Sequence, residues 1–219
     1  LFNKAIQGNY EMGSTFKLIT AAIGIEEKII NSDMLFDVSK PIKVGKYLIK
    51  DFHPYEGKLD LKGIIVKSSN IGIAKIANKI GKKTQQDFFQ EIGFYKKISL
   101  EIDETAMPSA NPNNWGKLET MTIGYGLGFA ITPLHLSQAY ASIVNDGYKV
   151  DPTLLLKKEN PLFIKRIVNT STSKLVRQLL RAVVLETEYT GPRVKIKGYE
   201  IGGKTGTAEL INKNGRYKK

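Results

Sequence analysis

The stretch Gly-Ser-Thr-Phe-Lys-Leu-Ile-Thr-Ala-Ala-Ile-Gly-Ile-Glu, residues 13–26, decides the fold. From residue 15 onward it is apolar on nearly every side, which predicts a buried helix. Ser14 stands at the start of that helix, where serine is a common N-cap. Lys17 stands where a capping box places Glu or Gln, and a cation there opposes the helix dipole by about 0.3–1 kcal/mol. A local rule broken without a structural gain indicates a functional position.

The spacing of Ser14 and Lys17 gives that function a chemical form. Residues three apart in a helix share one face. The apolar neighbours of Lys17 predict that it is buried, and a desolvated lysine loses its proton more readily. A neutral amine beside a hydroxyl can take its proton and make it a nucleophile. The pair therefore predicts a serine nucleophile with a lysine base.

A second motif is Ser68-Ser69-Asn70, just before a helix predicted from residue 70 to 80. Helix capping alone explains such residues. The functional alternative makes Ser68 a proton relay and gives Asn70 an amide that can hold a substrate carbonyl. Both interpretations stay open at the level of this motif.

The third motif is Gly203-Lys204-Thr205-Gly206-Thr207-Ala208. If it is a strand, Thr205 and Thr207 face one side and Lys204 faces the other. Gly206 has no side chain, so a peptide substrate could approach the backbone closely. Two hydroxyls and a cation suit a carboxylate ligand.

The remaining pattern predicts a mixed helix and strand protein. Helical spacing and capping residues predict further helices over 83–92, 132–146 and 172–186, hairpins over 40–60, an irregular stretch over 101–120 and a motif strand over 194–209.

Composition excludes several classes. The 219 residues correspond to one large domain or two small ones. The absence of cysteine excludes thiol catalysis and thiolate metal sites. The net charge of +12 comes from scattered lysines without a long basic run, so we expect no nucleic-acid partner. The two histidines, His53 and His135, have no metal-ligand spacing, so we expect no metal.

One apparent motif points elsewhere. Residues 198–205 match the phosphate-binding pattern G-x-x-x-x-G-K-[ST]. That pattern works only when the loop opens a helix facing the phosphates, and Gly206-Thr207-Ala208-Glu209 is a poor helix start. A nucleotide-binding protein is therefore the weaker interpretation.

In series, S-x-x-K, S-x-N and K-T-G point to one family. The chain resembles the transpeptidase domain of class B penicillin-binding proteins, most of all the division-specific, septal peptidoglycan D,D-transpeptidase. The resemblance covers essentially the whole chain. It rests on the three motifs together with Asn3-Lys4-Ala5-Ile6, Tyr10-Glu11-Met12-Gly13-Ser14, Pro108 with Trp115, Ile123-Gly124-Tyr125-Gly126 and Thr132-Pro133-Leu134.

The resemblance implies a role for each motif residue. Ser14 would attack the D-Ala–D-Ala bond of a stem peptide and become acylated, with Lys17 as base. Ser68 and Lys204 would relay the proton to the departing D-Ala, and an amine of a second stem peptide would release the acyl group as a cross-link. β-Lactams would acylate the same serine.

It also implies the binding contacts. Asn70 would orient the acyl chain, and Thr205, Gly206 and Thr207 would line the substrate site, the two threonines holding the terminal carboxylate. The backbone N–H groups of Ser14 and Thr207 would form the oxyanion hole. No cofactor is implied.

The implied architecture is the α/β (α+β) fold of penicillin-binding proteins and serine β-lactamases, an antiparallel sheet with a helical subdomain. Residues 1–219 would form the central segment of a single transpeptidase domain that lacks several sheet strands, with about 24–120 as the helical subdomain. The whole protein would sit at the bacterial inner membrane with this domain on the periplasmic face. Its partners would be stem peptides, β-lactams and division-machinery proteins. We also expect the isolated segment to be poorly stable, because the edge of its K-T-G strand would stay unpaired.

Two alternatives within the same fold remain. A D,D-carboxypeptidase uses these motifs with water as acceptor, and a β-lactam sensor domain binds the drug without turning over a stem peptide. The middle motif has Ser69 instead of aspartate, and no E-x-x-L-N segment for a deacylating glutamate is present. Both departures favour a penicillin-binding protein over a class A β-lactamase.

Overall fold

The computed structural model describes residues 1–109, 114–156, 165–187, 194 and 196–207. In chain order its elements are β1 Tyr10–Glu11, the 3-10 turn η1 Gly13–Thr15, α1 Phe16–Glu26, β2 Phe36–Asp37, β3 Ile42–Val44, β4 Tyr47–Ile49, β5 Lys58–Leu59, α2 Leu61–Val66, α3 Asn70–Ile80, α4 Lys82–Ile92, α5 Lys117–Ile123, β6 Ala130–Ile131, α6 Pro133–Val144 and α7 Thr170–Glu186. The strands within these ranges form antiparallel pairs, β1 with β6, β2 with β5 and β3 with β4. The expected α+β character with antiparallel pairing is confirmed.

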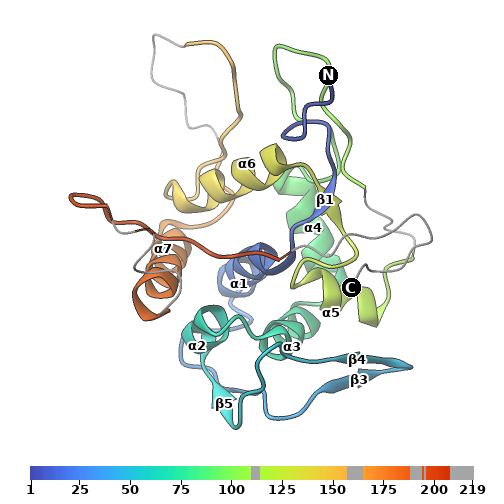
Figure 1. Cartoon of the computed structure of the whole chain (residues 1–219), viewed down its shortest axis with the longest axis vertical. Coiled ribbons are helices and arrows are strands. Elements are labelled where there is room, and N and C mark those ends of the chain that lie inside the picture. Colours follow the sequence, from blue (N-terminus) through green and yellow to red (C-terminus); the bar gives the residue numbers. More distant parts are fainter. Residues whose placement is uncertain (110–113, 157–164, 188–193, 195, 208–219) are drawn as a thin grey trace.

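Helix α1 lies at the centre of the molecule (Figure 1). Helices α2, α3, α4, α6 and α7 all contact it. Every residue from Phe16 to Gly24 is buried, which confirms the buried helix that the sequence predicts. A helix that is apolar all round is stable only when neighbours cover every side. The surrounding helices therefore fix the position of the Ser14 end of α1.

An aromatic cluster anchors the start of α1. The ring of Phe16 packs edge-on against Phe89 at 5.7 Å between centroids, and it also contacts Phe94 and Phe129. All four rings are buried. Burying one such side chain contributes about 1.5–3 kcal/mol. Because Phe16 stands between Ser14 and Lys17 in the sequence, this packing holds the S-x-x-K motif in place.

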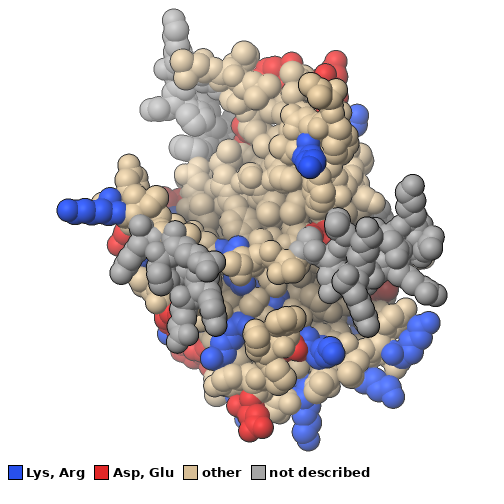
Figure 2. Space-filling view, viewed as in Figure 1, with Lys and Arg blue, Asp and Glu red and all other residues tan. Residues whose placement is uncertain are grey.

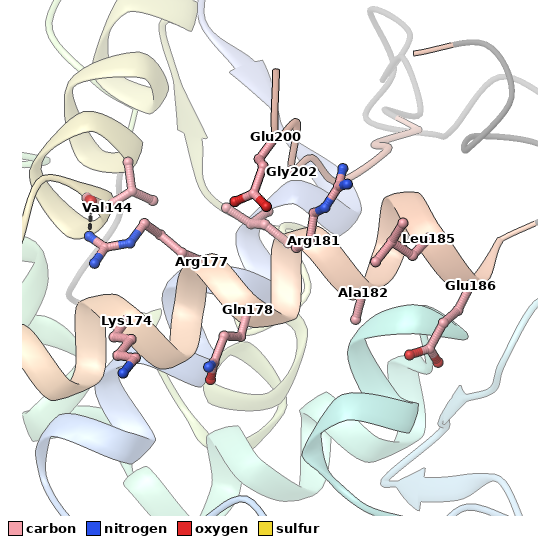
Figure 3. A pocket seen from close by; sticks show the side chains of 11 residues that line it. Val144, Lys174, Arg177, Gln178, Arg181, Ala182, Leu185, Glu186, Glu200 and Gly202 are labelled. Atoms are coloured by element: carbon pink, nitrogen blue, oxygen red, sulfur yellow. Dashed lines mark hydrogen bonds between the residues drawn. The ribbon is translucent and has the colours of Figure 1, made fainter. Parts of the chain in front are cut away.

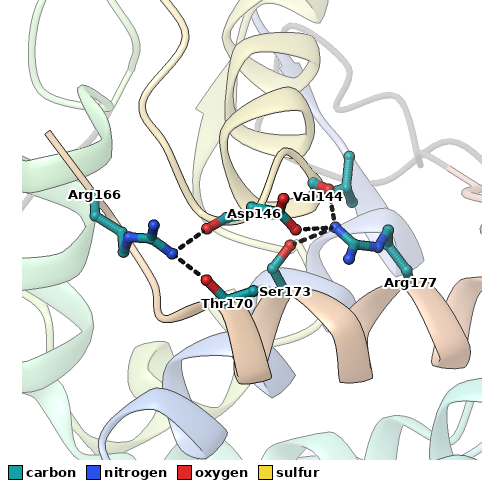
Figure 4. A network of polar contacts seen from close by, with 6 residues as sticks. All are labelled: Val144, Asp146, Arg166, Thr170, Ser173 and Arg177. Atoms are coloured by element: carbon teal, nitrogen blue, oxygen red, sulfur yellow. Dashed lines mark hydrogen bonds and ion pairs between the residues drawn. The ribbon is translucent and has the colours of Figure 1, made fainter. Parts of the chain in front are cut away.

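A polar network joins the end of α6 to α7 (Figure 4). The Nη1 atom of Arg177 donates to the Val144 carbonyl at 2.6 Å and to Asp146 Oδ1 at 3.0 Å. The Nη1 atom of Arg166 donates to the Asp146 carbonyl at 2.7 Å and also to Thr170 Oγ1. Both arginines are exposed, and the ion pair of Arg177 with Asp146 therefore adds little stability. The network mainly fixes how α6 meets α7.

The predicted helices form with shifts of one or two residues at their ends. The side chain of Thr132 accepts a hydrogen bond from the His135 N–H, and Pro133 opens α6 as the sequence predicts. Gly93 ends α4 in a left-handed conformation, φ 100°. Helices α2 and α5 are not anticipated by the sequence, because both are short. Helix α2 is also rich in β-branched residues.

The strand expected over 194–209 is not formed by the described residues 196–207. The Gly203 N–H donates to the Leu180 carbonyl of α7 at 3.1 Å, and Arg181 of α7 donates to the Ile201 carbonyl at 2.8 Å. A strand requires a neighbouring strand to pair with, and here the neighbour is a helix. The stretch is extended but unpaired, and we call it the K-T-G segment, residues 201–207.

Basic and acidic side chains are mixed on the surface. On the face shown in Figure 2, basic side chains gather over the lower half, the part formed by α2, α3 and the β3–β4 hairpin, with acidic side chains between them. No helix among the described residues is long and apolar enough to span a membrane.

Candidate active site

Ser14 lines a cleft of about 440 Å³. The same cleft is lined by Ser68 just before α3, by Asn70 at the start of α3, and by Thr205 and Thr207 from the K-T-G segment. Residues from three distant parts of the sequence thus meet at one place. The half-buried Ser14 in η1 is accessible to a ligand in this cleft.

Lys17 is fully buried, as the sequence predicts. Its Nζ donates to Ser68 Oγ at 3.0 Å and to the Ser68 carbonyl. The pKa of Lys17 is lowered to about 7, mainly by burial and also by the nearby Lys204 ammonium, whereas Asp51 acts to raise it. Near neutral pH this amine is therefore poised between its charged and neutral forms, which a base requires.

Ser68 joins the two amines of the site. Lys204 Nζ also donates to Ser68 Oγ at 3.0 Å, so one hydroxyl contacts Lys17 and Lys204 at the same distance. Burial lowers the pKa of Lys204 to about 8. Ser68 itself has φ +56°, a left-handed backbone that costs a non-glycine residue of order 1–3 kcal/mol. Strain of this kind is typical of functional positions.

The hydrogen bonds of Lys17 Nζ in the described part of the chain go to Ser68 and not to Ser14. The amine predicted to activate Ser14 thus contacts Ser68. Catalytic hydrogen bonds commonly tighten only when substrate is bound. The contact of Lys17 with Ser68 is therefore compatible with the predicted role of Lys17 as base.

Glycines let the K-T-G segment lie directly against η1, the turn that carries Ser14. Gly13 has φ +53°, and a Cβ there would lie 2.3 Å from the Thr207 carbonyl oxygen. A Cβ at Gly206 would lie 2.9 Å from the Met12 carbonyl oxygen and 2.8 Å from Thr15 Cγ2. These contacts explain why glycine is required at position 206, which the sequence alone does not reveal. Its bare Cα packs on the start of α1.

Two further contacts fix the start of α1. The Gly13 N–H donates to the Gly126 carbonyl at 3.2 Å, and Tyr140 Oη donates to the Thr15 carbonyl at 2.7 Å. Burial raises the pKa of the Tyr140 phenol, so the phenol keeps its proton and remains a donor. Such contacts hold η1, and Ser14 with it, in a fixed geometry.

Asp51 belongs to the site although no motif indicates it. Its carboxylate accepts hydrogen bonds from Ser69 Oγ at 2.7 Å and from the Ile71 N–H at 2.9 Å. A carboxylate at a helix start also complements the dipole of α3. Asp51 lies in the loop after β4, and no regular spacing links it to Ser69, so the sequence carries no signal for the contact.

We expect Asp51→Asn to change both stability and pH dependence. An amide cannot accept both of the present hydrogen bonds as a carboxylate does, so the free energy of unfolding should fall by about 1–3 kcal/mol. Loss of the negative charge should lower the pKa of Lys17 further. Denaturant unfolding and the pH profile of penicillin acylation would measure the two effects.

The matched control is Asp60→Asn. Asp60 Oδ1 caps α2 by accepting from the Gly63 N–H at 2.7 Å. This change should lower stability without moving the pH profile. In Asp51→Asn the pH at which acylation begins to rise should move to lower values. If that pH stays the same or moves higher, the result would contradict the electrostatic role assigned to Asp51.

The histidines do not form a metal site. His135 is buried between Thr132 Oγ1, 2.7 Å from Nδ1, and the Lys96 carbonyl, 3.0 Å from Nε2, and burial lowers its pKa. His53 is exposed at the cleft. The part of the chain that the structure describes contains no group of three or more metal-ligating side chains.

A second hollow, of about 650 Å³, runs along α7 (Figure 3). It lies between the helix and residues 200–202, and its described lining consists mainly of aliphatic and ionic side chains, together with Gln178. No serine or threonine is among those lining residues. The chemistry predicted from the sequence is therefore confined to the Ser14 cleft.

The phosphate-loop interpretation loses support. Lys204 donates to Ser68 Oγ, and Ser68 lines the Ser14 cleft. The helix that the pattern needs would fall on residues outside the described ranges.

A serine in the turn before a central helix, a buried lysine one turn later and a second lysine that meets it on Ser68 bring together the three motifs that are typical of penicillin-binding proteins. The chain belongs to this class by sequence as well. The penicillin binding protein transpeptidase domain family matches residues 1–219, and the chain is a member of that family.

Relatives and solved structures agree. The chain is 34% identical over 211 residues to the probable peptidoglycan D,D-transpeptidase FtsI of Caulobacter vibrioides, covering 94% of this chain and 35% of that protein. It is 32% identical to the probable peptidoglycan D,D-transpeptidase PenA of Neisseria flavescens, covering 98% of this chain and 53% of that protein. The chain thus spans between a third and just over half of these relatives.

The fold is shared with solved transpeptidase domains. The apo structure of the TP domain from Burkholderia pseudomallei penicillin-binding protein 3 superimposes with a TM-score of 0.90 at 26% identity, covering 99% of this chain and 66% of that one. The expected penicillin-binding protein fold is thereby confirmed.

Proposed function

We propose that this chain carries the active site of a peptidoglycan D,D-transpeptidase that acts in septum synthesis. The observation that carries the proposal is the meeting of Lys17 and Lys204 on Ser68 Oγ, each at 3.0 Å, beside the cleft that Ser14 lines. The septal assignment is supported by the FtsI name of relatives.

The chemistry follows from the two amines. In its neutral form Lys17 takes the Ser14 hydroxyl proton as the oxygen forms a bond to the carbonyl carbon of the D-Ala–D-Ala peptide. Ser68 and Lys204 then deliver a proton to the leaving nitrogen while the C–N bond breaks, releasing D-Ala and leaving an ester on Ser14. An amine of a second stem peptide displaces Ser14, and the new amide is the cross-link.

Binding and charge stabilisation use the K-T-G segment. Thr205 and Thr207 offer hydroxyls and Lys204 offers a cation to the terminal carboxylate of the donor. The N–H groups of Ser14 and Thr207 serve as oxyanion donors, each worth about 3 kcal/mol in the transition state. Asn70 donates through Nδ2 to the Lys50 carbonyl at 3.1 Å, which holds its amide at the cleft wall to orient the acyl chain.

The test is product analysis with the full-length protein, a D-Ala–D-Ala stem peptide and an amine acceptor. We expect a cross-linked amide product whose yield rises with acceptor concentration. Hydrolysis alone would support the D,D-carboxypeptidase alternative. A stable penicillin adduct without turnover of stem peptide would support a sensor domain.

The location and partners of the whole protein are part of the proposal. Relatives are peptidoglycan transpeptidases, whose substrate lies outside the inner membrane. We place this domain at the periplasmic face, with division-machinery proteins as partners of the full-length protein.

We expect the acylation rate to be bell-shaped in pH. Acylation needs neutral Lys17, so the rate should rise as pH passes about 7. Binding the carboxylate needs charged Lys204, so the rate should fall as pH passes about 8. Stopped-flow measurement of penicillin acylation across pH would show both limbs.

Lys204→Arg tests the alkaline limb. A guanidinium stays protonated, so this limb should disappear or move to much higher pH even if the maximal rate falls. An alkaline limb unchanged in this variant would assign it to another group.

A further inference from the structure

An exposed aromatic side chain stands at the mouth of the catalytic cleft. Phe52 lines the cleft with Ser14, Ser68 and Asn70, yet 90% of its surface is open to solvent. A single exposed hydrophobic residue is ordinary on a protein surface. This one lies within the site, where a ligand can cover it.

The backbone that carries Phe52 is tied to the catalytic motif on its N-terminal side. Asp51 accepts from Ser69 Oγ at 2.7 Å and from the Ile71 N–H at 2.9 Å. The Lys50 carbonyl accepts from Asn70 Nδ2 at 3.1 Å. These bonds join residues 50 and 51 to the start of α3, so the position of Phe52 is set relative to Ser68 and Asn70.

The ring also has a lateral support. His53 packs against it with a centroid distance of 4.9 Å and an interplanar angle of 89°. Edge-to-face pairs of this kind are favourable. His53 lines the same cleft. The pair therefore forms an aromatic wall of the cleft, and the contact with His53 restricts the orientations open to the Phe52 ring.

We propose that Phe52 forms an apolar subsite for the side chain on the acyl portion of the ligand that acylates Ser14. This rests on the proposed function, because Asn70, beside which Phe52 is held, is the residue assigned to orient the acyl chain. The hydroxyls and cations of the K-T-G segment take the carboxylate end. A phenyl ring offers burial without hydrogen bonds, so the group it selects is uncharged and apolar.

The experiment compares two penicillins that differ only in the acyl side chain, phenylacetyl or acetyl. For each, the second-order rate constant of acylation is measured on the full chain, in wild type and in Phe52→Ala. We expect the phenylacetyl-to-acetyl rate ratio to fall about tenfold in Phe52→Ala, equivalent to about 1.4 kcal/mol. Phe52→Leu should restore part of the ratio.

Leu48→Ala is the matched control. Leu48 in β4 is 58% exposed and is not among the residues that line the cleft, so the ratio should equal that of wild type. An unchanged ratio in Phe52→Ala, or an equal fall for both penicillins, would overturn the subsite while leaving the proposed function intact. Failure of wild type to be acylated by either penicillin would contradict the proposed function and the subsite with it.

Discussion

Replacing Lys17 by arginine should lower the rate of penicillin acylation by about 10²–10⁴-fold. A guanidinium stays protonated at every accessible pH. It therefore keeps the positive charge beside Ser68 but cannot take the Ser14 proton. The pKa of about 7 that burial gives Lys17 is the property that arginine lacks.

Lys17→Met separates the loss of the base from the loss of charge. Methionine fills much of the same buried volume without a charge, so its rate should fall as far as that of the arginine variant. Lys62→Arg is the control, because Lys62 is an exposed partner of Glu186 at 3.1 Å. Circular dichroism would be used to check that each variant is folded. Wild-type rates in folded Lys17→Arg would contradict the assignment of the base.

Replacing Gly13 by alanine should lower acylation at least about 100-fold, because a displacement of about 1 Å in a site can cost that much. The added Cβ would lie 2.3 Å from the Thr207 carbonyl oxygen, and φ +53° is unfavourable for alanine. The K-T-G segment would then move away from Ser14. The strained conformation should also lower the free energy of unfolding by about 1–2 kcal/mol.

The K-T-G segment itself offers a matched control. A Cβ at Gly203 meets nothing within 4 Å, and its N–H remains available to the Leu180 carbonyl. Gly203→Ala should therefore acylate at the wild-type rate. Equal rates in Gly13→Ala and Gly203→Ala would show that close packing of the segment on η1 is not needed for the reaction.

The central helix and the burial of Lys17 could be predicted from the sequence because their signals are local. The apolar residues of α1 predict its burial, and Lys17, three residues after Ser14, stands out among them within a single helical turn. Helix α6 was predictable for a similar reason, since Thr132 and Pro133 form a local start signal.

Long-range contacts could not be predicted in this way. The hydrogen bonds of Asp51 to the start of α3 join residues that no periodicity connects. The reason for Gly206 depends on Met12 and Thr15, which are distant in sequence. The strand expected around Lys204 also depends on a partner strand, which local alternation cannot supply. The motifs and the family resemblance indicated the candidate residues, and only the fold explains how they meet.

The most direct test of the account is mass spectrometry of the protein after incubation with penicillin, followed by peptide mapping. We predict a single stable adduct with the mass of the intact drug, located on Ser14, and no adduct in Ser14→Ala. An adduct on another residue, or one of equal yield in Ser14→Ala, would contradict the claim that Ser14 is the acylated nucleophile.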